Sequence, residues 1–396
     1  MLNTAFAPWP SFTQEEADAV SNVLLSNKVN YWTGQETRSF ETEFAQWSGS
    51  HHAIALTNGT VALDLALEGL GIQAGAEVIV TPRTFIASAS SVISVGATPV
   101  FADVDSDSGN LTAQSIRAAL TPRTKAVILV HLAGWPCDMD PIMELSREHG
   151  FKVIEDCAQS HGAHYKGKSL GSIGHVAAWS FCQDKIMTTG GEGGMVTTND
   201  HDLWSRMWSF KDHGKSWAAV YETDHPPGFR WLHEDFGTNW RMTEMQAVIG
   251  RIQLKRMKNW HTSRKTNAAL LYDGLTPFCG DEGMLRCPQP TADSQHAFYK
   301  FYAYVRPECL APGWTRDKIV QMINAAGVPC FQGSCSEVYK EQAFTKRGLQ
   351  PDTPCATARE LGDTSIMFLV HPTLTKQNME DAVKAIQDVC AQAGRS

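Results

Sequence analysis

One lysine, Lys185, stands between an apolar run and a glycine cluster in the stretch SFCQDKIMTTGGEGG, residues 180–194 of this chain. Apolar and glycine-rich neighbours exclude water, and desolvation favours the neutral, nucleophilic form of an amine. Such an amine can bond covalently to a carbonyl compound. Most lysines are solvated surface cations, so carbonyl chemistry at this residue requires other suitable groups nearby.

A second feature is the turn Asn58-Gly59-Thr60, where a predicted strand passes into an apolar-rich helix. Free N–H groups at a helix start attract anions, glycine allows close approach, and Thr60 adds a hydroxyl. Ser180, five residues before Lys185, ends another predicted strand and offers a further hydroxyl. The alternative for such a turn is a simple helix cap.

Three more side chains suit the binding of a planar ring. Phe85 follows a predicted strand and could stack on the ring, although packing in a core is the commoner use of phenylalanine. Asp156 ends another strand, and Gln159 follows three residues later, so both could contact polar ring atoms. A helix cap or a buried ion pair is the alternative for Asp156. With the anion site and the amine, these groups match the phosphate, ring and aldehyde of pyridoxal 5′-phosphate (PLP).

Seven short, mainly apolar runs are predicted to be the strands that position these groups. They span residues 53–58, 77–82, 99–104, 126–131, 152–157, 177–182 and 194–199. Segments long enough for crossover helices separate the first five, at residues 60–70, 85–95, 115–120 and 141–149. Nearly continuous apolar strands alternating with helices are typical of a parallel sheet covered on both faces. The sequence therefore predicts an α/β fold with about seven mostly parallel strands, whose carboxyl ends carry the site.

The character of the chain changes after about residue 242. Helical patterns at residues 243–264 and 266–275 precede a mixed region from about residue 289 to 396, in which 307–314 read as a loop. We predict a large cofactor-binding domain over residues 1–250. Residues 251–396 are predicted to form linking helices and a smaller α+β domain.

Composition argues against several classes of protein. A net charge of −8 without a basic run gives no general affinity for nucleic acid. No apolar stretch approaches the roughly 20 residues that span a bilayer, and the N-terminus does not resemble a signal peptide. The ten cysteines are scattered without a C-x-x-C pair. We expect a cytoplasmic protein with reduced thiols and no membrane insertion.

Two histidines three residues apart, His161 and His164, raise the possibility of a metal pair. No third ligand is apparent in the adjacent sequence, and zinc sites in proteins normally use three or four protein ligands. We therefore predict that the protein binds no metal.

Eight segments of the chain together resemble the DegT/DnrJ/EryC1/StrS family of PLP-dependent sugar aminotransferases, which have the fold-type I architecture. They are NYWTG (30–34), TNGTVALDLAL (57–67), TPRTFIAS (81–88), GATPVFADVD (96–105), RTKAVILVHLAGWPCDMD (123–140), VIEDCAQSHGAHYKGKSLGSIG (153–174), SFCQDKIMTTGGEGGMVTTND (180–200) and GTNWRMTEMQAVIG (237–250). The resemblance is dense from about residue 6 to 250 and thinner beyond. Asn58 stands where serine is common in the family, and Cys182 is a second small departure.

The resemblance implies how the cofactor would be held. Lys185 would bond to the cofactor aldehyde and later carry a proton between substrate carbon and cofactor carbon. Asp156 would pair with the pyridinium nitrogen, Gln159 would contact the ring hydroxyl, and Phe85 would lie against the ring face. The implied phosphate contacts are Gly59, Thr60, Ser180 and, from a neighbouring subunit, Asn239. That last contact implies a homodimer with active sites shared across the interface.

The implied substrate is a nucleotide-linked 4-keto-6-deoxy hexose, with L-glutamate as the amino donor. The context would be surface-polysaccharide or antibiotic amino-sugar biosynthesis. Four residues are candidates for substrate contacts: Arg241, His296, Tyr299 and His371. Their alternative is a role as packed or surface polar residues. The sequence does not specify the sugar, the nucleotide or the ring position that is aminated.

Two other functions stay open as alternatives. Related sugar 3-dehydratases, which use the amine form of the cofactor, carry histidine where the aminotransferases carry lysine, so Lys185 favours transamination. A non-catalytic regulatory protein on the same fold would be expected to have lost Lys185, Asp156 or Ser180. All three residues are present.

Overall fold

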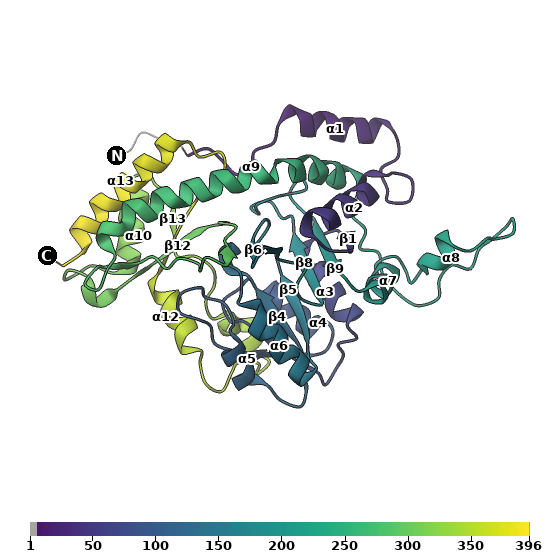
Figure 1. The fold of residues 1–396 in the computed structure, drawn as a ribbon, viewed down its shortest axis with the longest axis horizontal. Helices are drawn as coiled ribbons and strands as arrows, with labels where there is room; N and C mark the ends of the chain where they lie inside the picture. The colour runs from purple at the N-terminus through teal and green to yellow at the C-terminus, as the bar shows by residue number, and fades with distance from the viewer. Residues whose placement is uncertain (1–5, 396) are drawn as a thin grey trace.

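A seven-stranded sheet forms the centre of the larger part of the molecule, in a computed structural model that describes residues 6–395 (Figure 1). In spatial order its strands are β1 (His52–Leu56), β9 (Gly194–Thr198), β8 (Val176–Ser180), β5 (Lys152–Asp156), β4 (Thr124–Val130), β2 (Glu77–Val80) and β3 (Thr98–Phe101). The strands from β8 to β3 pair in parallel, and β9 is antiparallel to both of its neighbours. All seven predicted strands and the mostly parallel α/β sheet are confirmed.

Helices lie over this sheet, as its apolar strands require. The predicted crossover helices are present as α3 (Gly59–Gly69), α4 (Ala87–Ser94), α5 (Ala113–Ala119) and α6 (Met139–His149). Two further helices, α2 (Glu36–Ser48) and α7 (His201–Phe210), pack beside β1. As a result, residues 126–129 of strand β4 have no exposed surface. Burial on both faces explains why the strand reads as a continuous apolar run.

One long helix, α9 (Glu244–Leu275), connects the two parts of the molecule (Figure 1). Thr243 caps its N-terminus, and the hydroxyl of this residue accepts the N–H of Gln246 in a capping box. Its first half packs against α1 (Gln14–Leu25) and α2, and its last turns pack against α13 (Lys376–Ala393). The sequence predicted two helical segments here. They form one continuous helix because no glycine or proline interrupts the chain between them.

The smaller part is built on an antiparallel sheet with its own hydrophobic core. The strand order is β10 (Leu285–Arg286), β12 (Phe301–Val305), β14 (Ser365–Phe368) and β13 (Cys330–Phe331), and helices α10 (Arg316–Ala325) and α13 belong to the same core. Within the predicted loop 307–314, residues Pro307–Cys309 form a 3₁₀ turn. The predicted α+β character is confirmed. The domain boundary at residue 250 stays a prediction, since α9 continues through it.

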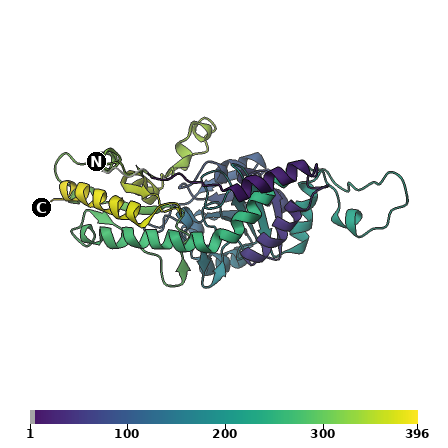
Figure 2. The same cartoon turned by 90° about the horizontal axis from the view of Figure 1, so that it is seen from above.

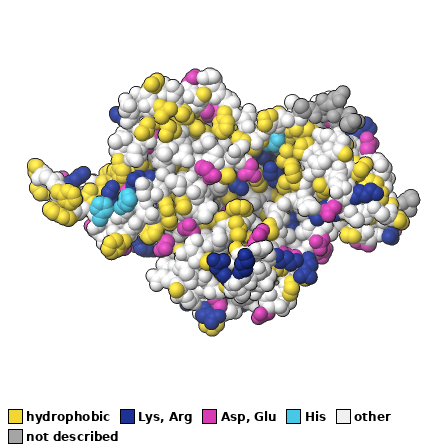
Figure 3. All heavy atoms as spheres, turned by 180° about the vertical axis from the view of Figure 1, so that it is seen from behind, with side chains coloured by type: hydrophobic (Ala, Val, Ile, Leu, Met, Phe, Trp, Pro, Cys, Tyr) yellow, Lys and Arg dark blue, Asp and Glu magenta, His cyan; other side chains and the backbone are white. Residues whose placement is uncertain are grey.

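A segment after α7 projects away from the rest of the molecule (Figures 1 and 2). It contains the short helix α8 (Trp217–Tyr221) and the irregular residues up to about 238. Phe229, Trp231 and Phe236 are 76%, 82% and 93% exposed on this projection. Its surface is visibly rich in hydrophobic side chains (Figure 3). Exposed aromatic groups at such density are typical of a contact surface.

Candidate active site

A cavity of about 1090 Å³ opens at the carboxyl ends of β4, β5 and β8. The small sheet forms its other wall, through residues at β12, β13 and β14. The structure brings eight of the predicted residues into the lining: Gly59, Thr60, Phe85, Asp156, Gln159, Ser180, Lys185 and Tyr299. They come from segments far apart in the chain. The topology of the sheet is therefore what gathers them.

Gly59 and Ser180 meet at one end of the cavity, where α3 begins. Asn58 caps the helix by accepting the N–H of Val61 at 3.0 Å, so the N–H groups of Gly59 and Thr60 have no intrahelical acceptor. A Cβ atom at position 59 would lie 2.6 Å from Cβ of Ser180, which only glycine avoids. The result is a narrow, polar recess with free N–H groups and two hydroxyls. This recess fits a phosphate group.

Asp156 and Gln159 lie on the floor of the cavity, at the end of β5. Ser88 of α4 donates to Oδ2 of Asp156 at 2.7 Å, and the N–H of Ala158 donates to Oδ1 at 3.1 Å. Burial raises the pKa of the Asp156 carboxyl above its ordinary value. The side-chain oxygen of Gln159 accepts the N–H of Ala133 at 2.7 Å. A buried carboxylate without a full ion pair fits a cationic ring nitrogen.

Lys185 lies in the turn after β8, and its surroundings orient it. Its Nζ is 3.8 Å from Oδ1 of Asp184 and 5.2 Å from the centroid of the Tyr299 ring. The hydroxyl of Tyr299 donates to the same aspartate. From the N-terminal segment, the indole of Trp9 donates to the carbonyl oxygen of Lys185 at 2.7 Å. The amine is thus held on both its side-chain and its main-chain end.

Phe85 borders the cavity with most of its ring exposed, since 69% of its surface is open to solvent. Side chains of this size are usually buried in a core. The predicted alternative, a core phenylalanine, is therefore not what the structure shows. An accessible ring at a cavity wall fits stacking against a planar group.

Four of the predicted residues lie elsewhere. His371 stacks on Trp9 with ring centroids 6.0 Å apart, and His296 stacks on Phe298 at 4.2 Å beside a separate small cavity. Arg241 pairs with Asp212, and Asn239 lies exposed at the base of the projection. Among the described residues, none of these four lines the main cavity. Their roles stay predictions.

The Arg241–Asp212 pair belongs to a buried charge cluster whose loss should be measurable. Asp212 and Lys211 have no exposed side-chain surface, and burial lowers the pKa of Lys211 to about 8. Asp212 lies 2.7 Å from Arg241 and 3.5 Å from Lys211. An Asp212→Asn variant should lose about 3 kcal/mol of unfolding free energy, because Lys211 and Arg241 would lose the buried carboxylate that they share. Urea denaturation with saturating cofactor measures this loss.

The control is Asp140→Asn, which breaks an exposed pair with Lys166. That change should cost less than about 1 kcal/mol. Equal effects of the two substitutions would contradict a special contribution from the buried cluster.

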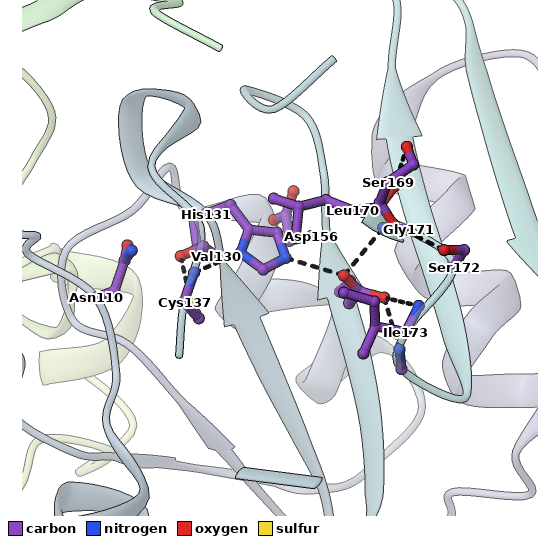
Figure 4. Close-up of polar contacts among 12 residues, drawn as sticks. Asn110, Val130, His131, Cys137, Asp156, Ser169, Leu170, Gly171, Ser172 and Ile173 are labelled. Atoms are coloured by element: carbon purple, nitrogen blue, oxygen red, sulfur yellow. Dashed lines mark hydrogen bonds and ion pairs between the residues drawn. The ribbon is translucent and has the colours of Figure 1, made fainter. Parts of the chain in front are cut away.

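A buried trio beneath the cavity has the residue types of a metal site. Ligand atoms of His131, Glu155 and Cys157 lie within 4.8 Å of one another. The hydrogen bonds around them point to another use (Figure 4). Nδ1 of His131 accepts the N–H of Cys137 at 3.1 Å, which places the ring proton on Nε2, 3.2 Å from Glu155. Burial raises the pKa of Cys157 to about 12, so its thiol stays protonated.

Glu155 also accepts three backbone N–H groups, from Gly171, Ile173 and Gly174, at 2.6–3.0 Å. The lone pairs of Glu155 are therefore already used. This carboxylate, which His131 contacts, holds residues 171–174 against the strand that carries Asp156 (Figure 4). His161 is buried beside Trp179, and burial lowers its pKa to about 3. His164 belongs instead to β6 (His164–Tyr165). The prediction that the protein binds no metal stays a prediction.

Several residues at the site were missed by the sequence analysis. Ser88, Asp184 and Lys300 line the cavity, and Trp9 contacts the turn that carries Lys185. Ser88, Asp184 and Lys300 lie within three residues of predicted site residues, so proximity in sequence could have suggested them. Nothing in local spacing indicates Trp9, whose contact joins residues 176 positions apart.

Comparison with known proteins decides the family. A model of the DegT/DnrJ/EryC1/StrS aminotransferase family matches residues 10–387. The chain belongs to this family. GDP-perosamine synthase of Caulobacter vibrioides is 42% identical to this aminotransferase over 319 residues, which are 81% of each protein. A UDP-N-acetyl-3-dehydro-alpha-D-glucosamine 3-aminotransferase of Acidithiobacillus ferrooxidans is 34% identical over 378 residues, or 96% of this chain and 94% of the relative.

Solved structures support the same assignment. The crystal structure of an aminotransferase from Psychrobacter cryohalolentis superimposes with a TM-score of 0.96 at 63% identity, covering 98% of this chain and 99% of that one. The fold is that of the PLP-dependent aminotransferases of fold-type I. This aminotransferase is therefore a PLP-dependent enzyme of the sugar aminotransferase class.

Proposed function

We propose that this enzyme transfers the amino group of L-glutamate to the ketone of a nucleotide-linked 4-keto-6-deoxy hexose. The observation that carries the proposal is the cavity itself, in which the amine of Lys185 and the buried carboxylate of Asp156 share one space of about 1090 Å³. That space exceeds what a cofactor alone needs. The names of relatives with GDP-, UDP- and dTDP-linked sugars support a nucleotide on the substrate.

The residues of the cavity have distinct proposed roles. PLP supplies an electron-withdrawing ring that stabilises negative charge on the substrate carbon. The recess of Gly59, Thr60 and Ser180 would hold its phosphate, and Phe85 would lie against its ring face. Asp156 would hold a proton on the ring nitrogen, with Ser88 fixing the orientation of the carboxylate. Gln159 would contact the ring hydroxyl.

Lys185 is proposed both to bind the aldehyde and to move the proton. Asp184 and the ring of Tyr299 flank its amine and restrict where Nζ can lie. The hydrogen bond from Trp9 fixes the main chain of the same residue. An amine constrained at both ends can pass a proton between two neighbouring carbons without a large rearrangement.

We further propose that the enzyme works as a homodimer with shared active sites. Asn239 lies exposed at the base of the projection, and within residues 6–395 it does not line the cavity of its own chain. The projection also exposes Phe229, Trp231 and Phe236. In the proposed dimer the interface covers these rings, and Asn239 reaches the phosphate recess of the second subunit. Sedimentation of the purified protein measures the assembly state.

The proposed context is the biosynthesis of an amino sugar for a surface polysaccharide or an antibiotic. A Bacillus subtilis relative, 32% identical, is named as a spore coat polysaccharide biosynthesis protein. None of the helices in residues 6–395 is long and apolar enough to cross a membrane. We propose the cytoplasm as the compartment, since nucleotide sugars are made there.

The test is to incubate the PLP-loaded enzyme with L-glutamate and a panel of nucleotide-linked keto sugars. Formation of 2-oxoglutarate together with a product carrying one amino group in place of the ketone oxygen is expected for a 4-keto-6-deoxy hexose. The panel should include 3-keto sugars and sugars that retain the 6-hydroxyl. If the enzyme aminates only a 3-keto sugar or only a sugar with a 6-hydroxyl, the proposed substrate is wrong but the proposed transamination stands.

The runner-up reaction is dehydration of a nucleotide sugar by the amine form of the cofactor. The same panel separates the two, because a dehydratase would release a deoxygenated sugar that carries no nitrogen. Lys185 occupies the position at which the dehydratases carry histidine, so we expect no such product.

A further inference from the structure

A second amine, that of Lys300, lines the same cavity as Lys185. Lys300 directly precedes β12, so it belongs to the small sheet, whereas Lys185 follows β8 of the large one. The ring of Tyr299 lies near both amines, with its centroid 5.2 Å from Nζ of Lys185 and 4.8 Å from Nζ of Lys300. The two amines therefore approach the active site from different parts of the molecule.

Lys300 forms no ion pair with any carboxylate in residues 6–395. The negative charge of Asp184 acts on Lys300, but this carboxylate already accepts a hydrogen bond from the Tyr299 hydroxyl and faces Lys185. The lysine residue is partly buried. A cation in this position has lost part of its hydration without gaining a counter-ion.

Arg264 and Lys185 place further positive charge near Lys300. Arg264 of α9 is 1% exposed, and its guanidinium donates only to the carbonyl oxygens of Phe298 and Tyr299. Burial lowers the pKa of Lys300 to about 8, and the charges of Arg264 and Lys185 act in the same direction. The lining of the whole cavity also holds the carboxylates of Asp156, Asp184, Glu192 and Glu341. The excess of positive charge is therefore local to Lys300, Lys185 and Arg264, and there it favours the binding of an anion.

We propose that Lys300 binds an anionic oxygen of a substrate, either a carboxylate of the amino donor or a phosphate of the nucleotide sugar. This inference rests on the proposed function. Beyond Lys185 the cavity continues along the small sheet, past Phe331, Ser334 and Met367, so it has room for the charged part of either substrate. When that anion binds, it supplies the counter-ion that Lys300 lacks.

Three variants of the PLP-loaded enzyme test this role. Lys300→Met removes the charge and keeps the length of the side chain, and Lys300→Arg keeps the charge. Lys168→Met changes an exposed lysine of β7 (Lys168–Ser169) and is the matched control. Calorimetry on the aldehyde-loaded enzyme, which does not react with a keto acid, measures the binding of 2-oxoglutarate and of UDP, GDP and dTDP.

We expect Lys300→Met to weaken the binding of one probe class by about 10- to 100-fold, the range for a charge-assisted hydrogen bond. Lys300→Arg should recover most of that loss, and Lys168→Met should change nothing. A loss confined to 2-oxoglutarate identifies the donor carboxylate as the ligand, and a loss confined to the nucleotides identifies the phosphate. Unchanged binding of every probe to Lys300→Met would overturn the proposal.

The visible absorbance of bound PLP separates this result from a failure of the proposed function. Lys300→Met should keep the absorbance of the Lys185-bound cofactor, because the covalent bond forms at a different amine. A variant that loses both absorbance and probe binding has lost the cavity as a whole. That outcome would contradict a specific role for Lys300 as well.

Discussion

Replacing Lys185 with alanine is expected to reduce amino transfer by about 10⁴-fold or more, because it removes both the nucleophile and the group that moves the proton. The purified variant should also lack the visible absorbance of covalently bound PLP. The phosphate recess and Asp156 do not depend on this side chain, so the variant should still bind the cofactor without a covalent bond. Absorbance and a coupled assay for 2-oxoglutarate measure the two effects.

Lys185→Arg is the sharper control, since it keeps a positive charge beside Asp184 and Tyr299 but offers no reactive amine. It should be as inactive as the alanine variant. Lys168→Ala, at an exposed lysine, should behave as the wild type. Normal sugar amination by Lys185→Ala would refute the assignment of this residue and of the reaction built on it.

The second large effect is expected from Asp156→Asn. The amide cannot hold a proton on the ring nitrogen by charge, so the cofactor becomes a weaker electron acceptor, and we expect kcat to fall by about 100- to 1000-fold. The covalent bond at Lys185 does not require this carboxylate. Absorbance should therefore persist while turnover is lost, which distinguishes this variant from Lys185→Ala.

The pH dependence of PLP affinity provides an independent test of the role of Asp156. Burial raises the pKa of this carboxyl, so its protonation begins at a higher pH than for an ordinary aspartate. Only the ionised form pairs with a cationic ring, so the affinity of the wild type for PLP should fall as the pH is lowered through that pKa. The Asn variant should lack this step. Identical pH profiles for the two proteins would contradict the pairing, and Asp140→Asn, at an exposed carboxylate, is the matched control.

The large sheet could be predicted from sequence because burial on both faces leaves a direct signal. Strands such as β4 are continuous apolar runs, and several of the parallel strands reach the carboxyl edge of the sheet at a polar residue. Asp156 and Ser180 are such residues, and parallel pairing brings their strand ends together. The floor of the cavity follows from that pattern and from the family resemblance.

The outer wall of the cavity could not be predicted in this way. Which residues of the small sheet face the cavity depends on how that sheet packs against the large one, and no local pattern records it. His296 and Tyr299 are three residues apart, yet only Tyr299 lines the main cavity. Lys300 is adjacent to Tyr299 in sequence, but no local pattern shows that both side chains face the same cavity. Likewise, the buried partner of Arg241 becomes evident only when α7 and the segment before α9 are placed together.

The contacts of Trp9 bear on the order in which this chain must fold. Its indole reaches a carbonyl oxygen 176 residues away, and the neighbouring Pro8 accepts a hydrogen bond from Thr373, 365 residues away. Contacts between such distant positions form late, because the intervening chain must be organised first. The segment that contains Pro8 and Trp9 is therefore among the last parts of the described chain to settle. The turn that carries Lys185 therefore acquires its contact with Trp9 late in folding.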